Sequence, residues 1–445
     1  PAYSPHQAVG DFGPFQKWLV LLTLFPCLSV AFHQFCQLFM VQHVPHRCDT
    51  SWIRAIGPNL TEEERLNLTL PRDADGAYEQ CSMYSPVDWD LGSIMLYGLN
   101  ATEKCSNGWV YPSPVKNKSI SVSFLQFDLV CDRKDLNDIS QSIYMLGLFL
   151  GSMIFGPLSD RIGRRPVILI SIFLQGLALT TRLLSSPPGE VFCRGNTLFA
   201  IGEIICMDDS EPSFFFSATE WVGVSSRPKA VLISHCCFAI GQMILAGLSY
   251  GIRNWRLLEI AGSAPIFALF FYIWVLPESA RWLVTKGRIE EAKKVLQKAA
   301  SINKRTISPE LLEQVPVMAW GTACCLQRLS SVLGYACSVP LCPSFRFVNS
   351  LVYYGLSLNV TNFGLDIYLT QLAFGAVEIP ARIGCIFLLQ WLGRKKSQAV
   401  LLLLSGLVYQ PVTTTVLAVL GKFAASASFS TSYVYSAELF PTVVR

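Results

Sequence analysis

Glu378, Arg382 and Lys422 are ionisable residues inside long apolar stretches of the chain, where a charge is costly. Glu378 and Arg382 lie in the stretch from residue 363 to residue 389, and Lys422 lies in a later one. Because they are four residues apart, Glu378 and Arg382 share one face of a helix. An ionisable residue within a membrane span is a functional candidate by default. Arg382 is our first candidate for binding a substrate carboxylate through a planar, two-pronged contact, and Lys422 is the second.

Uncharged side chains extend this candidate site. Tyr353 and Tyr354 could stack on a heteroaromatic ring, and His33, Gln34 and Gln242 are polar residues inside other apolar stretches. Structural roles compete with these interpretations, since the buried charges could neutralise each other, the lysine could extend toward a membrane surface, and the aromatic rings could only pack. The sequence contains no nucleotide-binding loop, metal-ligand cluster or nucleophile–base set, so we expect no cofactor, no metal and no enzymatic activity.

The composition places these residues in a membrane protein. The 445 residues are 51% hydrophobic and only 15% charged, whereas soluble domains carry about 25% charged residues. Apolar stretches of about 20 residues recur, which is the length that crosses the hydrocarbon core of a bilayer. No basic tail or basic–aromatic stripe indicates a nucleic-acid partner. We expect an all-α multi-pass membrane protein in contact with lipid, and the sequence gives no indication of its oligomeric state.

The polar segment from residue 41 to residue 138 has the features of an extracellular loop. Four glycosylation sequons lie in it, at Asn59, Asn67, Asn100 and Asn117. Four cysteines lie in it as well, at Cys48, Cys81, Cys105 and Cys131. They predict two disulfides, with three possible connectivities. If this loop is extracellular, the N-terminus lies in the cytosol.

Alternating apolar and basic segments give the rest of the topology. The expected spans cover residues 17–40, 140–156, 167–184, 230–250, 257–276 and 363–389, with two more between 397 and 437. The segment from 277 to 314 is rich in Lys and Arg, so the positive-inside rule places it in the cytosol. Residues 289–300 have the spacing of an amphipathic helix on the membrane face.

Two further spans are required for the topology to alternate, and both fall in abnormal segments. The fourth must lie between residues 194 and 220, where four acidic residues would together cost about 10 kcal/mol if they faced lipid. The seventh must lie between residues 315 and 354, where prolines and cysteines interrupt the apolar sequence. We interpret these segments, and the end of the chain within a recognisable motif, as the result of alternative exons or a faulty gene model.

The turn between the second and third spans carries the strongest motif, G-P-L-S-D-R-I-G-R-R, which begins at Gly156. Gly156 would let helices approach closely, Asp160 would cap and pair with a neighbouring helix, and Gly163 would allow a tight turn. After the sixth span comes P-E-S-A-R-W-L, which begins at Pro277. We expect ion pairs among these cytosolic residues to hold the two halves of the protein together in one state and to break in the other.

Both halves of the chain repeat these motifs in the same order. A weakened copy of the turn, W-L-G-R-K-K, begins at Trp391, with Gln390 in the place of Asp160. A glutamate followed seven residues later by an arginine closes a span in each half. Such repetition is what a duplicated six-span unit leaves behind. The residues expected in the cytosolic gate are Asp160, Arg161, Arg164, Arg165, Glu220, Arg227, Glu278, Arg281, Glu438 and Arg445.

These motifs resemble those of a known family. The turn closely matches the G-x-L-x-D-R-x-G-R-R/K signature of the major facilitator superfamily. P-E-S-A-R-W-L is similar to the P-E-S-P-R-W-L signature of the sugar porters and the organic ion transporters, and a large loop with cysteines and sequons is typical only of the latter. Further tracts that resemble the organic ion transporter family cover residues 10–13, 15–16, 107–109, 111–112, 127–132, 219–221, 254–256 and 435–442. Residues 353–358 and 364–382 are most similar to organic anion transporters of the nicotinate and urate type.

The resemblance implies a major facilitator fold of two six-helix halves, the second truncated here, with a small organic ion bound between them. The expected domains are an N-terminal half (1–276), a cytosolic linker with the amphipathic helix (277–316) and an incomplete C-terminal half of about four spans (317–445). The expected function is secondary active or exchange transport of small organic anions, such as aromatic monocarboxylates or urate-like molecules, across the plasma membrane. The alternatives are an organic cation or carnitine transporter, for which Asp366 is the one loose carboxylate, and a non-transporting or defective paralogue.

Overall fold

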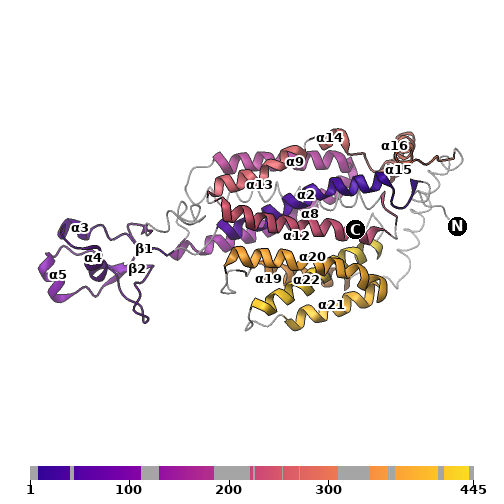
Figure 1. Ribbon diagram of the computed structural model, residues 1–445. Coiled ribbons are helices and arrows are strands. Elements are labelled where there is room, and N and C mark those ends of the chain that lie inside the picture. The colour runs from indigo at the N-terminus through magenta and orange to yellow at the C-terminus, as the bar shows by residue number, and fades with distance from the viewer. Residues whose placement is uncertain are drawn as a thin grey trace.

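The computed structural model describes most of the chain, and the chain is mostly helical (Figure 1). The described residues are 9–40, 45–111, 130–184, 221–223, 226–252, 254–269, 271–308, 341–358, 360, 366–408 and 415–439. The predicted fourth span lies outside them, and the predicted seventh span is described only from residue 341 onward.

Nine long helices are described. They are α2 (Pro14–Met40), α8 (Asp135–Ile162), α9 (Arg164–Leu184), α12 (Arg227–Gly251), α13 (Trp255–Leu269), α19 (Leu341–Leu358), α20 (Ile367–Trp391), α21 (Arg394–Val408) and α22 (Thr415–Leu439). They match the predicted apolar spans that lie within the described ranges, although α13 ends at Leu269, before the predicted end of its span at residue 276. Four of them are long and apolar enough to cross a membrane over Pro14–Cys36, Gln141–Ile162, Pro228–Gly251 and Ile367–Trp391. The helix at the second span is longer than predicted, because α8 continues through the G-P-L-S-D-R-I motif up to Gly163.

The long helices form two groups that meet along α12. Figure 1 shows α2, α8, α9, α12 and α13 on one side and α19 to α22 on the other. Helix α12 packs against α2 within its own group and against α20 and α22 of the second group. Gly375 of α20 makes this close approach possible, since a Cβ there would lie 2.9 Å from the carbonyl oxygen of Ala239 in α12. The seam between α12 and α20 therefore joins the two groups.

Three short helices follow the first group. They are α14 (Tyr272–Val275), α15 (Ala280–Thr285) and α16 (Ile289–Ile302). Helix α16 covers the predicted amphipathic segment and ends two residues later than expected. It buries Ala292, Leu296, Ala299 and Ala300. Leu296 and Ala299 join a cluster with Phe15 and Leu19 of α2 and Ile168 of α9, so α16 is docked on the first group.

Residues 45–111, together with 130–134, form a small disulfide-bonded subdomain at one end of the helices (Figure 1). It adds two short antiparallel sheets to the otherwise helical chain. One sheet pairs β1 (Arg47–Cys48) with β4 (Trp109–Val110), and the other pairs β2 (Ser82–Tyr84) with β3 (Thr102–Lys104). The remaining elements are α3 (Ile53–Ile56), α4 (Glu62–Thr69), α5 (Leu91–Tyr97) and the 3₁₀ turn η1 (Cys131–Arg133).

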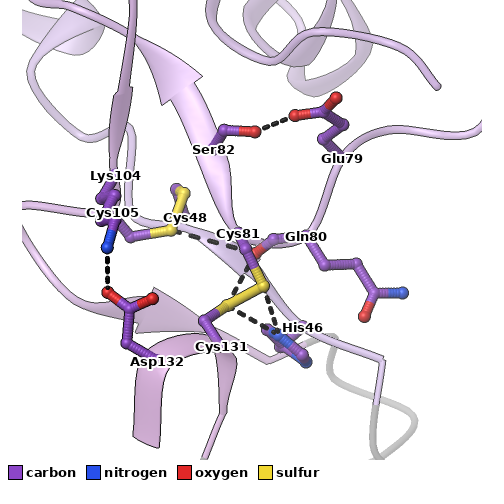
Figure 2. Close-up of a disulfide and its surroundings, with 10 residues drawn as sticks. All are labelled: His46, Cys48, Glu79, Gln80, Cys81, Ser82, Lys104, Cys105, Cys131 and Asp132. Atoms are coloured by element: carbon purple, nitrogen blue, oxygen red, sulfur yellow. Dashed lines mark hydrogen bonds and ion pairs between the residues drawn. A yellow bond between two sulfur atoms is a disulfide. The ribbon is translucent and has the colours of Figure 1, made fainter.

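The four predicted cysteines form two disulfides in this subdomain, Cys48–Cys105 and Cys81–Cys131 (Figure 2). This is one of the three connectivities that the sequence left open. The first disulfide lies in a buried cluster with Leu70 and Met83. The second ties the subdomain to η1, which leads directly into α8. Crosslinks of this kind stabilise small domains whose hydrophobic core is limited.

Helix α4 begins with a capping box. The hydroxyl of Thr61 accepts a hydrogen bond from the backbone N–H of Glu64, and the Glu64 carboxylate accepts one from the backbone N–H of Thr61. The Thr61 hydroxyl also donates to the Glu64 carboxylate at 2.7 Å, and this hydrogen bond, together with the one from the Thr61 backbone N–H, lowers the pKa of Glu64. The neighbouring Glu62 pairs with the Arg47 guanidinium, whose hydrogen bond and charge lower the pKa of Glu62. The capping box fixes the start of α4, and the ion pair ties α4 to β1.

The predicted glycosylation sites have different surroundings. Asn59, Asn67 and Asn100 have exposed side chains, whereas Asn117 lies outside the described residues. The side-chain oxygen of Asn67 accepts a hydrogen bond of 2.7 Å from the Tyr78 hydroxyl. Exposure makes these positions accessible to a glycan, and glycosylation stays a prediction.

Replacing both Cys48 and Cys105 with serine is expected to destabilise the subdomain by about 2–5 kcal/mol, because the unfolded chain regains the freedom of a long loop. The thermal unfolding temperature of the purified chain should fall, and less folded chain should be recovered. The control is Cys237→Ser, which changes a half-buried cysteine that is free in the structure. Equal unfolding temperatures for the double variant and this control would contradict the prediction.

Candidate substrate-binding site

Glu378, Arg382 and Lys422 meet in the interior of the second helix group, and Tyr353 joins them. The Glu378 carboxylate forms ion pairs with the Arg382 guanidinium and, at 2.9 Å, with the Lys422 ammonium. It also accepts a 2.8 Å hydrogen bond from the Tyr353 hydroxyl. All four side chains are buried, and Arg382 is only 2% exposed. We call these four residues the charge cluster.

Local sequence explains how the helices position the charge cluster. Helix α20 buries a stripe of residues at spacings of three and four, which is the period of one helix face. The stripe consists of Thr370, Gln371, Phe374, Gly375, Glu378, Ala381, Arg382, Cys385 and Leu389. Opposite it, α22 is rich in buried alanine and serine between residues 424 and 432. Small residues let two helices approach closely inside a membrane, so Lys422 of α22 comes within reach of Glu378.

Aromatic rings surround the two cations. The Lys422 ammonium nitrogen lies 3.5 Å from the ring centroid of Tyr353, and 5.9 and 5.8 Å from those of Phe35 and Phe374. The Arg382 guanidinium carbon lies 5.8 Å from the ring centroid of Phe238. A cation over an aromatic face is stabilised even where water is excluded. The rings of α2 and α12 thereby bring the first helix group into the site.

The charge cluster holds two cations and one carboxylate, so it carries one net positive charge. Hydrogen bonds to serine hydroxyls orient both cations. The Arg382 Nε–H donates to Ser426 at 3.1 Å, and the Lys422 ammonium donates to Ser357. A buried positive charge is expensive unless it is compensated. An anion that enters this site would supply that compensation.

The other predicted substrate residues lie around the charge cluster at different depths. Tyr354 is half-buried, with its ring edge-on to Tyr353 at 5.3 Å. Gln242 of α12 is buried and donates a hydrogen bond to Gln371 of α20 across the seam. His33 and Gln34 of α2 are buried as well. The α2 residue whose ring contacts Lys422 is, however, neither of these two but the next one, Phe35.

Sequence analysis missed several residues of this site. Ser357 is four residues after Tyr353, and Phe374 is four residues before Glu378, so helical spacing from a predicted residue could have found both. Ser426 and Phe35 carry no such signal. A buried acid elsewhere was also missed: Glu259 of α13 is fully buried, and its carboxylate lies 3.9 Å from the Cys36 sulfur of α2. Its position within a predicted span was the available signal.

The G-P-L-S-D-R-I-G-R-R motif forms the turn between α8 and α9. Arg164 is the first residue of α9, and its guanidinium pairs with the Asp160 carboxylate at 2.6 Å. The Glu278 carboxylate accepts hydrogen bonds from the backbone N–H groups of Arg164 and Arg165 at 3.1 and 3.3 Å. Glu278 therefore caps the N-terminus of α9, where a negative charge is favoured. The Trp282 indole N–H donates to the Asp160 carbonyl at 3.0 Å.

The two glycines of this motif differ in their roles. Gly163 has a φ of +109°, and a Cβ there would lie 2.9 Å from the Glu278 carboxylate, so the turn requires glycine as predicted. The expectation for Gly156 is not met by the described helices, because a Cβ at Gly156 would meet no atom of the described residues within 4 Å.

Only part of the predicted gate can be placed. Arg161 is exposed near the end of α8. Glu220 and Arg445 lie outside the described residues. Arg227, Arg281 and Glu438 lie in α12, α15 and α22, but their side chains lie outside the described part of the chain.

One group of three metal-ligand residue types occurs among the described residues, at His46, Cys81 and Cys131. The His46 Nε2 atom lies 3.4 Å from the Cys131 sulfur and 4.0 Å from the Cys81 sulfur (Figure 2). The two sulfurs form a disulfide with each other. Since a thiolate, not a disulfide sulfur, is the metal ligand, His46 packs on a crosslink here.

Comparison with known proteins places the chain in a family. The model of the Major Facilitator Superfamily matches residues 133–445. Human solute carrier family 22 member 13 is 45% identical, with 98% of this chain and 80% of that protein covered. The chain belongs to solute carrier family 22. Human member 14 of this family is 37% identical, with 98% of this chain and 76% of that protein covered. Rat organic anion transporter 3 is 33% identical, with coverages of 98% and 81%.

The fold of this family 22 chain is that of the major facilitators. A solved structure of the proton:xylose symporter XylE matches with a TM-score of 0.60 at 14% identity, over 97% of this chain and 83% of that one. The predicted major facilitator fold is confirmed. The chain is a multi-pass membrane carrier and not an enzyme.

Proposed function

We propose that this chain carries small organic anions, such as aromatic monocarboxylates and urate-like molecules, across the plasma membrane by alternating access, as a secondary active or exchange carrier. The charge cluster is the observation that carries the proposal, because its two cations exceed its one carboxylate. The name of the rat relative, organic anion transporter 3, supports the same substrate class.

The geometry suggests how a carboxylate would bind. Arg382 and Lys422 contact different oxygens of Glu378, so a second carboxylate that approaches from the opposite side could bind both cations at once. Arg382 would supply the planar contact, and Lys422 would supply a point charge. The Tyr353 ring, 3.5 Å from Lys422, could stack on an aromatic ring attached to that carboxylate.

The environment of Asp366 argues against a role for this carboxylate in binding an organic cation. Asp366 is the N-cap of α20, and its carboxylate accepts a hydrogen bond from the Tyr368 backbone N–H at 2.8 Å. A capping carboxylate has a structural role at a helix end, and Asp366 is exposed. It therefore offers no buried site for a cation.

The disulfide-bonded subdomain supports an orientation with the N-terminus in the cytosol. Disulfides form and persist in oxidising compartments, which supports a position of the subdomain outside the cell. The segment with α15 and α16 is rich in Lys and Arg and lies at the opposite end of the helices (Figure 1), as the positive-inside rule requires. We divide the carrier accordingly into the halves 1–276 and 317–445, joined by the cytosolic linker 277–316.

Uptake in oocytes tests the proposed function. Cells that express the chain would be given labelled nicotinate, urate or tetraethylammonium, with surface biotinylation to measure how much chain reaches the membrane. Saturable uptake of an anion, and not of tetraethylammonium, is expected. Uptake of tetraethylammonium alone would make the chain a cation carrier. A surface-expressed chain that moves none of the three compounds would contradict the proposal and favour a non-transporting paralogue.

Asp160→Asn is expected to slow turnover more than it weakens substrate binding. The variant loses the charge that pairs with Arg164 at the turn between α8 and α9, whereas the charge cluster lies on α19, α20 and α22. A single ion pair whose carboxylate is exposed contributes only about 0–1 kcal/mol, so a rate change of severalfold is the expected size. The measurement is the maximal uptake rate and the KM for the same labelled anion. An effect on KM alone would contradict the gating role.

A further inference from the structure

Aromatic side chains meet at the end of the α12–α20 seam next to the disulfide-bonded subdomain. The Tyr368 ring of α20 stacks on the Phe39 ring of α2, with centroids 5.4 Å apart and planes 23° apart. It also meets the Tyr250 ring of α12 edge-on, at 5.7 Å. Tyr368 thus comes from one helix group and lies against two helices of the other.

Tyr368 lies on the same face of α20 as the charge cluster. Positions 368, 371, 375, 378 and 382 follow each other at spacings of three and four, which is one helix face. Ten residues separate Tyr368 from Glu378, which is about 15 Å along a helix. A substrate that enters at this end and follows this face must pass Tyr368 before it reaches Glu378.

The seam is closed between Tyr368 and the charge cluster. One turn below Tyr368, Gln371 and Gln242 are both fully buried and hydrogen-bonded to each other. One turn further, Gly375 lies against α12. Phe39 is fully buried in a cluster that includes Phe35 and Phe238 and on which Tyr368 packs. In this conformation the helix groups are therefore in contact along the whole path.

We propose that Tyr368 is the outer gate of the carrier, whose ring must leave Phe39 and Tyr250 before a substrate can enter from the outside. The inference rests on the proposed function and orientation, and it adds a gating position that the sequence motifs did not mark. Alternating access requires the outer ends of the two halves to separate. That separation would break the contacts of Tyr368 and the hydrogen bond between Gln242 and Gln371. Loss of the ring should therefore shift the equilibrium toward the outward-open state.

The test measures access and does not depend on transport. A cysteine replaces Gln371, and intact cells are treated with a membrane-impermeant thiol reagent from the outside. Labelling is compared in four chains that all carry Gln371→Cys: one with no further change, and one each with Tyr368→Phe, Tyr368→Ala and Tyr250→Ala. Labelling of the chain without Gln371→Cys gives the background of native cysteines. The rate is expressed per molecule at the surface, from biotinylation.

Tyr368→Ala is expected to speed labelling about 2- to 10-fold for each aromatic pair that is lost, and two pairs are lost. Tyr368→Phe keeps both rings in contact and should label like the chain with Tyr368. Tyr250→Ala removes one pair from the opposite helix group and should give an intermediate rate, which guards against a local defect in α20. Equal rates in all chains would overturn the gate, even with normal anion uptake. If the labelling rates differ as expected but the chain takes up no anion, the gate is supported and the proposed substrate class is wrong.

Discussion

Arg382→Ala is expected to abolish anion uptake while the chain still reaches the cell surface. Charge-assisted hydrogen bonds contribute about 1.5–3 kcal/mol, so the loss of one such partner lowers affinity by about 10- to 100-fold. The variant also reduces the net charge of the cluster from one positive charge to zero. Folding should survive, because Glu378 keeps its ion pair with Lys422 at 2.9 Å and its hydrogen bond from Tyr353.

Two matched variants sharpen this measurement. Arg382→Lys keeps the charge but loses the planar fork and the hydrogen bond to Ser426, so uptake should be intermediate. Lys104→Ala removes an exposed cation of the disulfide-bonded subdomain that pairs with Asp132, and it should leave uptake unchanged. Uptake by Arg382→Ala equal to that of the parent chain, at equal surface density, would remove Arg382 from the substrate site.

The sequence predicted the helices well because the signal for a membrane span is local. The length and the hydropathy of an apolar stretch of about 20 residues can both be read from that stretch alone. Helices α2, α12 and α20 accordingly begin and end within a few residues of the predictions. The pairing of Glu378 with Arg382 was predictable for the same reason, since both lie on one helix face. The four cysteines were predictable as a set, but their pairing depends on how the subdomain folds.

The rest of the candidate site depends on contacts between helices. Lys422 meets Glu378 across two helices, and no local pattern connects residues 44 apart in sequence. The sequence did not distinguish Tyr353 from Tyr354. Adjacent residues of a helix are about 100° apart around its axis, so the two side chains point in different directions. Only Tyr353 donates to Glu378. Sequence analysis did not mark Phe35 or Tyr368, because their partners lie on other helices.

Glu378→Gln is expected to destabilise the carrier by about 3–5 kcal/mol, since removal of one partner from a buried ion pair leaves uncompensated charge. Here it leaves two buried cations without the carboxylate that both contact, Arg382 and Lys422. The variant should show a lower thermal unfolding temperature in detergent and a smaller surface fraction than the parent. Glutamine keeps nearly the volume of glutamate and can still accept from the Tyr353 hydroxyl, so packing alone cannot account for the loss.

A double variant separates charge balance from the loss of one particular contact. Glu378→Gln combined with Lys422→Met returns the cluster to one net positive charge, held by Arg382 alone, and methionine can occupy the space between the Tyr353 and Phe35 rings. If repulsion between the cations causes the instability, the double variant should recover most of the unfolding temperature, and the two substitutions should be strongly non-additive. Additive losses would contradict this and show that Glu378 and Lys422 each stabilise the carrier through separate contacts. A recovered fold with weak anion uptake would then assign Lys422 to substrate binding, because Arg382 would be the only cation left to hold the carboxylate.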